Sequence, residues 1–97
     1  MKLRFTRRAA QDLTDIADYL RSRSPAGAAN VRTAIFDSLQ ILTEFPFAGH
    51  LQSVEKVRKI VTRKYSYLIY YEISPSRDAI VVITIQHASR QREFQDN

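Results

Sequence analysis

Residues 57–92, VRKIVTRKYSYLIYYEISPSRDAIVVITIQHASRQR, decide the fold because they hold three consecutive segments with the composition of β-strands. The last segment is the most β-branched run of the chain, and the middle one is dense in tyrosine and isoleucine. Only a tight turn near Tyr65 and a loop of turn-forming residues over 74–78 separate them. Connections this short predict an antiparallel meander with strands over 57–64, 67–73 and 79–86.

The N-terminal part of the chain has the periodicity of one short strand and two helices. Residues 2–5 alternate charged and apolar side chains, as a half-buried strand does. Apolar residues then recur at intervals of three and four over 7–23 and again over 25–45, which predicts two amphipathic helices. Ser24 and Pro25 suit the N-cap and the first position of the second helix, so the two helices form a hairpin. We therefore predict an α+β domain in which an N-terminal strand and an antiparallel two-helix hairpin pack on an antiparallel β-sheet of three to four strands.

The alternation of side chains along the strands predicts which residues face the helices. We expect one face of the sheet to pack on the helical hairpin through Ile69, Tyr71, Ile73, Val81, Ile83 and Ile85. The opposite face, called the second face below, would then carry Leu68, Tyr70, Ile80 and Val82. A second face this apolar is either covered by the C-terminal tail or kept for a partner, because monomers seldom expose large apolar patches.

The composition indicates one folded domain spanning 1–97, with 91–97 as a candidate flexible tail. No apolar run approaches the roughly 20 residues that cross a bilayer, and the N-terminus lacks the apolar core of a signal peptide. The absence of cysteine excludes disulfides, a thiol nucleophile and thiolate metal sites. These features predict a cytoplasmic protein, and its formal charge of +5 favours nucleic acid or an acidic protein as a partner.

Metal and cofactor sites are not indicated by the sequence. The only histidines, His50 and His87, have no carboxylate at ligand spacing. The aspartates at 12, 15 and 18 are expected on the solvated side of the first helix, where Arg8 and Asp12 have the spacing of a surface pair. With two glycines in the whole chain, a glycine-rich phosphate loop is excluded. We expect neither a cofactor nor a metal.

Positive charge is concentrated on the first strand of the meander and beyond the last one. Five cations without an intervening acid lie in the stretch 56–64, namely Lys56, Arg58, Lys59, Arg63 and Lys64. Along a strand they divide between the two faces, so they are either the exposed side chains of an edge strand or a partial site for phosphates or an acidic segment. His87 and Arg90 could support proton transfer and charge stabilisation in RNA cleavage, although a histidine at a strand end is commonly structural.

Several short segments occur in a characteristic order, namely Ala9-Ala10-Gln11-Asp12-Leu13-Thr14-Asp15-Ile16, Ser24-Pro25 with Ala28-Ala29, Leu42-Thr43-Glu44-Phe45-Pro46 with Gly49, Val57-Arg58, Tyr67-Leu68-Ile69 with Tyr71, and Ile85-Gln86-His87-Ala88-Ser89-Arg90. In order and spacing they resemble the ParE branch of the RelE/ParE toxin superfamily, from about residue 3 to 92. The resemblance implies the toxin of a type II toxin–antitoxin system that inhibits bacterial growth. It also implies a ParD-like antitoxin as the bound partner and DNA gyrase as the target. Contact with DNA would be indirect, through the antitoxin.

Two alternatives remain open from the sequence. The first is a RelE-like endoribonuclease that cuts mRNA on the ribosome with Lys59, Arg63, His87 and Arg90. Against it, Val61 and Leu68 stand where such enzymes are basic, Ala88 or Ser89 where an arginine is expected, and Phe94 where a tyrosine hydroxyl is needed, and each missing charge weakens transition-state stabilisation. The second alternative is an inactive homologue that only binds the antitoxin or acts as a corepressor.

On this sequence we favour a binding protein without catalytic residues over an enzyme. Its binding surface for antitoxin or target is predicted to be the sheet, with the following residues: Arg58, Lys59, Arg63, Lys64, Tyr67, Leu68, Tyr70, His87, Arg90 and Arg92.

Overall fold

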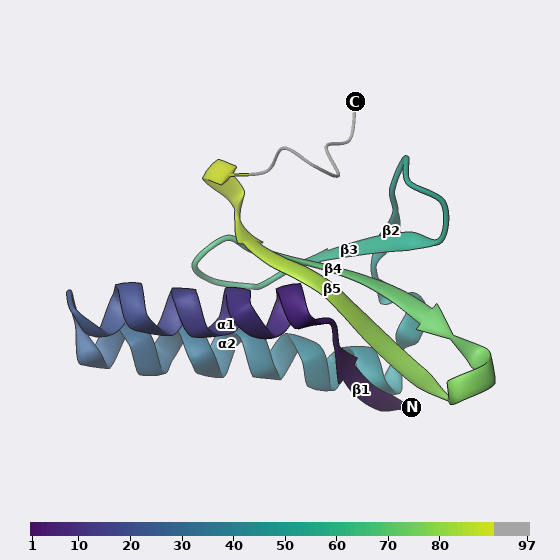
Figure 1. Cartoon of the computed structure of the whole chain (residues 1–97), viewed down its shortest axis with the longest axis horizontal. Helices are drawn as coiled ribbons and strands as arrows, with labels where there is room; N and C mark the ends of the chain where they lie inside the picture. Colours follow the sequence, from purple (N-terminus) through teal and green to yellow (C-terminus); the bar gives the residue numbers. More distant parts are fainter. Residues whose placement is uncertain (91–97) are drawn as a thin grey trace.

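The computed structural model describes residues 1–90 as two helices packed on one face of a five-stranded sheet (Figure 1). The helices are α1 (Arg7–Arg21) and α2 (Pro25–Glu44). The strands are β1 (Lys2–Phe5), β2 (His50–Leu51), β3 (Val57–Val61), β4 (Tyr67–Ser74) and β5 (Ala79–His87). Short 3₁₀ helices follow α2, β4 and β5, namely η1 (Pro46–Ala48), η2 (Pro75–Arg77) and η3 (Ala88–Arg90). The α+β class and the helical hairpin are confirmed.

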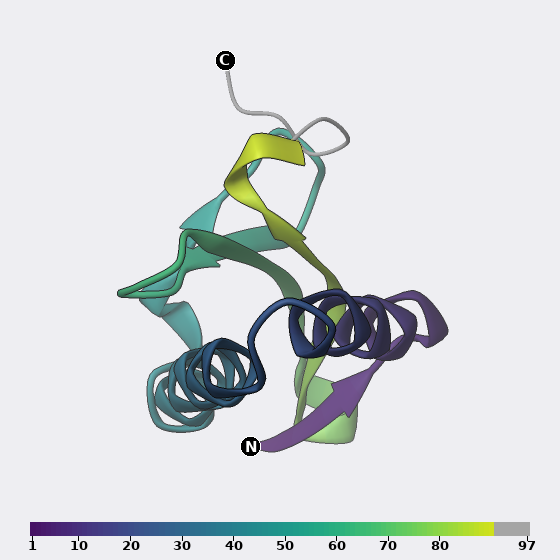
Figure 2. The same cartoon turned by 90° about the vertical axis from the view of Figure 1, so that its left-hand side faces the viewer.

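Both helices begin at an N-cap hydroxyl, and Ser24 is the cap that the sequence predicts for the second helix. The Thr6 hydroxyl accepts a hydrogen bond from the Ala9 N–H, and the Ser24 hydroxyl accepts one from the Gly27 N–H. Figure 2 looks along the two helices, which lie side by side beneath the sheet. α1 ends at Arg21, two residues earlier than predicted, and Ser24 follows so closely that the hairpin turn is tight. In the part of the chain that is described, no helix is long and apolar enough to span a membrane.

The sheet contains more strands than the sequence predicts, and it is mixed rather than antiparallel. Its order is β1-β5-β4-β3-β2, and β1 pairs in parallel with β5 at the edge, while the other pairs are antiparallel. The additional strand is β2, which falls in a stretch expected to be a turn and a polar connection. A strand of two residues is too short to show a periodic pattern in the sequence. β2 is recognised as a strand only from its pairing with Arg58 and Lys59.

The first strand of the meander is shorter than predicted. β3 ends at Val61 instead of residue 64, because Thr62 already closes the hairpin: its N–H donates to the Tyr67 carbonyl and its hydroxyl accepts from the Tyr67 N–H. Tyr65 and Ser66 have φ values of 70° and 54°, the left-handed conformation of a tight turn. Residues 62–66, called the hairpin tip below, therefore carry Arg63 and Lys64 off the sheet.

An irregularity in the pairing of β4 with β5 changes which side chains face the helices. Tyr70 pairs with Thr84 but Tyr71 pairs with Val82, so Ile83 is an extra residue in β5. A bulge of this kind reverses the alternation of side chains on its strand. Consequently Ile80 and Val82 pack on the helix side and Ile83 packs on the second face, contrary to prediction. The predicted helix-side positions of Ile69, Tyr71, Ile73 and Ile85 are confirmed.

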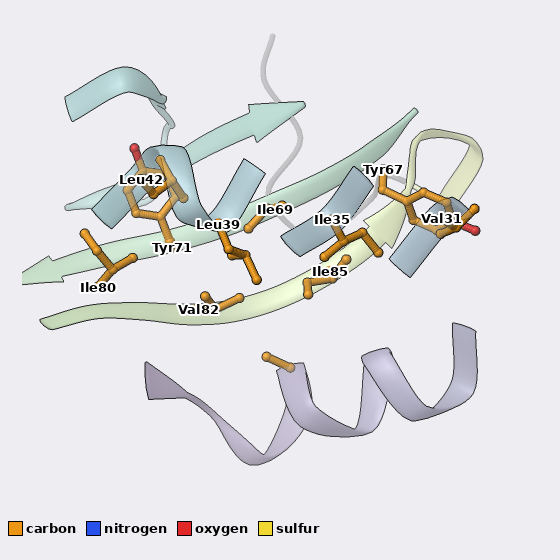
Figure 3. Packing of buried hydrophobic residues seen from close by; sticks show 11 residues of the cluster. Val31, Ile35, Leu39, Leu42, Tyr67, Ile69, Tyr71, Ile80, Val82 and Ile85 are labelled. Carbon is orange, nitrogen blue, oxygen red and sulfur yellow. The ribbon is translucent and has the colours of Figure 1, made fainter. Parts of the chain in front are cut away.

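The main core lies between the helices and the sheet (Figure 3). α2 contributes one stripe of buried residues, Val31, Ile35, Leu39 and Leu42, which meet Tyr71 and Val82 of the sheet. Burying each such side chain stabilises the fold by roughly 1.5–3 kcal/mol. A smaller cluster of Val57, Leu68 and Tyr70 with Ile83 lies on the second face, so Leu68 and Tyr70 are buried on the face where they were predicted.

Candidate functional site

Within residues 1–90 the structure divides the predicted basic residues among four places. Lys59 lies on the second face, since it pairs with Tyr70 and is two residues from Val57. Arg58 lies on the helix side, opposite Tyr71. Arg63 and Lys64 are exposed at the hairpin tip. Arg90 belongs to η3, and Arg92 and Phe94 fall outside the described residues.

Arg58 has contacts within the chain that fix its side chain. Its guanidinium donates to the Gly49 carbonyl oxygen at 2.8 Å and lies 4.9 Å from the centre of the Phe47 ring. The Gly49 N–H donates in turn to the Tyr71 hydroxyl at 2.8 Å, and that hydroxyl donates to the Pro46 carbonyl at 2.7 Å. Burial raises the pKa of Tyr71, and the Gly49 hydrogen bond and the charge of Arg58 lower it in part. These contacts join η1 and the start of β2 to the sheet.

The aromatic and apolar members of the predicted surface are buried. Tyr67 belongs to the helix-side core, while Leu68 and Tyr70 belong to the cluster on the second face. These three side chains therefore pack inside the protein. Lys59 is the member of the predicted set that remains partly exposed on the second face.

His87 ends β5 and is exposed. Its ring lies edge-on to the Tyr67 ring, with centroids 5.2 Å apart and planes at 83°. The Ser89 N–H donates to Nδ1 at 3.2 Å, and the Ser89 hydroxyl oxygen lies 2.9 Å from the same ring nitrogen. The ring is therefore oriented by its own backbone and by Tyr67, and it presents a defined nitrogen outward.

The residues proposed for RNA cleavage do not converge. Lys59 pairs with Tyr70 and Tyr70 with Thr84, so Lys59 is two strands and three residues away from His87. With about 4.8 Å per strand and about 3.3 Å per residue, their Cα atoms are about 14 Å apart in a flat sheet. Arg63 points from the hairpin tip toward a groove beside α2, on the other side of the sheet from Lys59. Groups that act on one phosphodiester must reach the same few atoms.

Asp12 has a role that the sequence analysis missed. β1 pairs with β5 only as far as Val82, and the edge of β5 beyond it is closed by α1. The Asp12 carboxylate accepts hydrogen bonds from the Ile85 N–H at 3.0 Å and from the Thr84 hydroxyl at 2.5 Å. The expected surface placement of Asp12 is therefore wrong. Asp12 lies one turn before Ile16, on the helix face that meets the sheet, and this position is the one indication in the sequence of a buried role. The open edge of β5 can be recognised only in the folded structure.

Exposed apolar side chains at the end of α2 were also missed. Phe45, Phe47 and Leu51 are 62%, 70% and 60% exposed. Phe45 is the last residue of the apolar periodicity over 25–45, but α2 ends at Glu44 before Pro46, and the Phe45 side chain remains exposed. Three large apolar residues exposed within seven positions are a feature of interaction surfaces.

Comparison with known proteins identifies the family. The family model described as the ParE toxin of the type II toxin–antitoxin system parDE matches residues 3–92. The chain belongs to the ParE toxin family. A candidate toxin of Sinorhizobium fredii, Y4kP, is 32% identical over 90 residues, which are 93% of this chain and 91% of that protein.

Solved structures share the fold of this ParE-family chain at low sequence identity. A chain of the chromosomal ParDE system from P. aeruginosa superposes with a TM-score of 0.76 at 23% identity, covering 90% of this chain and 95% of that one. A chain of the intact E. coli RelBE toxin–antitoxin complex gives 0.68 at 23% identity, covering 92% and 98%. At these identities the likeness establishes the RelE/ParE fold alone, because both branches of the superfamily use it.

Proposed function

We propose that this ParE-family chain arrests bacterial growth by binding DNA gyrase, and that a ParD-like antitoxin encoded beside it neutralises it by forming a hetero-oligomer. Membership of the ParE family and the similarity to a ParDE system support the proposal. Gyrase acts in the cytoplasm, so the proposal places the protein there. The toxin contacts DNA only through its partners.

The observation that carries the proposal is the separation of Lys59, Arg63 and His87. Each is exposed or partly exposed, but they lie on the second face, at the hairpin tip and at the end of β5. Val61 and Leu68 are uncharged and add no cation to the second face. Without several cations around one phosphate, little stabilisation of a pentavalent transition state is available. Scattered cations are instead suited to carboxylates distributed along a protein partner.

A gyrase assay tests the proposal. Purified protein, freed from antitoxin, is added to gyrase with relaxed plasmid and ATP. We expect loss of supercoiling and accumulation of cleaved DNA at micromolar protein. Full supercoiling together with growth arrest in cells would eliminate gyrase as the target, and absence of growth arrest would leave only the role of an inactive antitoxin partner or corepressor.

A second candidate function is ribosome-dependent cleavage of mRNA, and the geometry of His87 is what favours it. The ring is exposed, and Nδ1 contacts Ser89, so Nε2 lies on the other side of the ring from that contact. An exposed imidazole nitrogen of this kind suits a general acid or base, because it can reach a bound substrate. Codon-specific cleavage in a translation mixture, lost in His87→Ala, would establish this function, whereas intact mRNA would exclude it.

A further inference from the structure

A cluster of cations lies at the corner of the molecule where β1, the start of α1 and η2 meet. Lys2 and Arg4 belong to β1, Arg7 is the first residue of α1, and Arg77 is the last residue of η2. The Lys2 N–H donates to the Asp78 carbonyl at 2.9 Å, so η2 lies directly beside the beginning of β1 (Figures 1 and 2). These four basic residues are called the basic corner below.

The side chains of the basic corner are exposed and unpaired. Within residues 1–90 none of the four forms an ion pair, a side-chain hydrogen bond or a cation–π contact. The first acidic residue of the sequence is Asp12, and Asp78 is the acidic residue that lies beside the corner. Positive charge therefore remains in excess there.

The two cations of β1 point to the same side of the sheet. Leu3, between them, packs on the core beneath, so Lys2 and Arg4 are directed away from the helices, about 6.6 Å apart along the strand. Arg4 pairs with Val81, and Val81 pairs with Glu72, which places that carboxylate two strands from Arg4, about 10 Å away. An anion that approaches this edge of the sheet therefore meets cations first.

Stability of the fold does not account for the whole cluster. Cations on an edge strand discourage pairing with another chain, which would explain Lys2 and Arg4. Arg7 and Arg77 lie outside the strand, so this explanation does not extend to them. Arg7 also opposes the dipole of α1, whose first turn contains no acidic residue. Unpaired cations from three separate elements are instead expected of a surface that binds an anionic partner.

We infer that the basic corner contacts the phosphate backbone of DNA that gyrase holds, an inference that rests on the proposed function and adds to it a contact within the gyrase–DNA complex. Guanidinium and ammonium groups form charge-assisted hydrogen bonds with phosphate oxygens, and these contacts need no apolar surface. Met1 and Phe5, the large apolar residues beside the corner, are 39% and 37% exposed, so charge dominates this surface. Four cations bind DNA weakly on their own, so the contact depends on gyrase.

A comparison of two affinities tests the contact. Fluorescence anisotropy measures binding of the labelled protein to gyrase alone and to gyrase loaded with a linear DNA duplex. A direct contact with DNA raises the affinity for the loaded enzyme, and we expect a preference of about tenfold at low salt. The triple variant Lys2→Gln, Arg4→Gln, Arg77→Gln should bind both forms of gyrase equally.

The salt dependence of the same binding counts the phosphate contacts. Each cation that neutralises a phosphate adds about 0.9 to the slope of log affinity against log salt concentration. For three contacts, the slope measured with loaded gyrase should be less steep by about 2.7 in the triple variant. The slope measured with gyrase alone should be the same for both proteins.

A second triple variant controls for the loss of charge. Arg21→Gln, Arg23→Gln, Arg32→Gln removes the same charge at or near the turn between the helices, and α1 alone is about 22 Å long. In Figure 1 this turn lies at the opposite end of the molecule from β1. The control variant should keep the preference for loaded gyrase, and circular dichroism verifies that both variants are folded.

The outcomes separate this inference from the proposed function. A preference for loaded gyrase that is lost in the corner variant and kept in the control supports the contact with DNA. An unchanged preference in the corner variant overturns it and leaves gyrase as the target. Equal weakening with and without DNA also overturns it, because the corner would then contact an acidic surface of gyrase itself. If the unmodified protein binds neither form of gyrase, the proposed target fails and this inference fails with it.

Discussion

The Tyr71 hydroxyl accepts a hydrogen bond from the Gly49 N–H at 2.8 Å, which joins the middle of the sheet to the connection between α2 and β2. The same hydroxyl donates to the Pro46 carbonyl. This connection positions Phe45, Phe47 and Leu51 at the surface, so the two hydrogen bonds link the core to these exposed apolar side chains. Rigid aromatic side chains lose little conformational entropy when they bind.

Removing the Tyr71 hydroxyl should destabilise the fold. In Tyr71→Phe the Gly49 N–H and the Pro46 carbonyl lose their partner in a buried site, at a cost of about 1–3 kcal/mol. Urea unfolding measures the loss. Tyr65→Phe, which removes the hydroxyl of a half-exposed ring, serves as the control and should unfold like the unmodified protein.

A methyl group at Gly49 should also destabilise the fold, through steric overlap. Its Cβ would lie 2.6 Å from the Tyr71 hydroxyl and 2.9 Å from the Lys59 carbonyl oxygen. The backbone of Gly49 is extended, with φ −78°, so alanine can adopt the same backbone conformation and the expected loss comes from the steric overlap. We expect Gly49→Ala to lose about 1–3 kcal/mol in thermal or urea unfolding.

Gly27→Ala provides the matched control for that substitution. The added Cβ would lie 3.1 Å from the Ser24 hydroxyl, and alanine favours the helix by about 1 kcal/mol. The two effects oppose each other, so the net change should be smaller than at Gly49. Equal losses at both glycines would contradict the account of the contact with Tyr71.

The raised pKa of Tyr71 predicts a loss of stability at high pH. The unfolded chain releases this proton near the ordinary tyrosine pKa of 10.0, whereas the folded protein retains it to higher pH. Above about pH 10 the unfolded state therefore binds fewer protons, and stability falls until the folded-state pKa is passed. Urea midpoints at about pH 8 and about pH 10.5 measure the fall, which should be smaller in Tyr71→Phe. Identical falls in both proteins would refute this origin.

Asp12→Ala should open the edge of β5. The substitution leaves the Ile85 N–H and the buried Thr84 hydroxyl without their acceptor, which we expect to cost about 1–3 kcal/mol and to accelerate hydrogen exchange at the Ile85 amide. Asp18→Ala removes an exposed pair with Arg21 on the same helix and should change stability by less than about 1 kcal/mol. Slow exchange at Ile85 in Asp12→Ala would disprove the role of the carboxylate.

Local sequence patterns predicted the helices and the main strands. The features that were not predicted, such as β2 and the bulge in β5, depend on which strands pair and in which register. Thr6, Ser24 and Pro46 act through neighbours a few residues away, so their roles are readable from the sequence. The bulge at Ile83 depends on the register of two strands, which alternation alone does not determine.

The candidate site shows the same limit. Cations were recognised by type, but β3 ends at Val61, and this places Arg63 away from Lys59. Likewise, the sequence predicts that Asp12 lies at the surface, and only the folded structure shows the edge of β5 beside it. Sequence identifies the chemical groups, and the tertiary fold decides which of them meet.

We propose that the protein acts by binding gyrase, without catalysis by Lys59 or His87. The most direct measurement is the yield of cleaved plasmid when gyrase is titrated with the unmodified protein and with the double variant Lys59→Ala, His87→Ala, alongside mRNA integrity in a translation mixture. We predict equal accumulation of cleaved DNA with both proteins and intact mRNA. Cleaved mRNA with the unmodified protein only, and no cleaved DNA with either, would contradict the account.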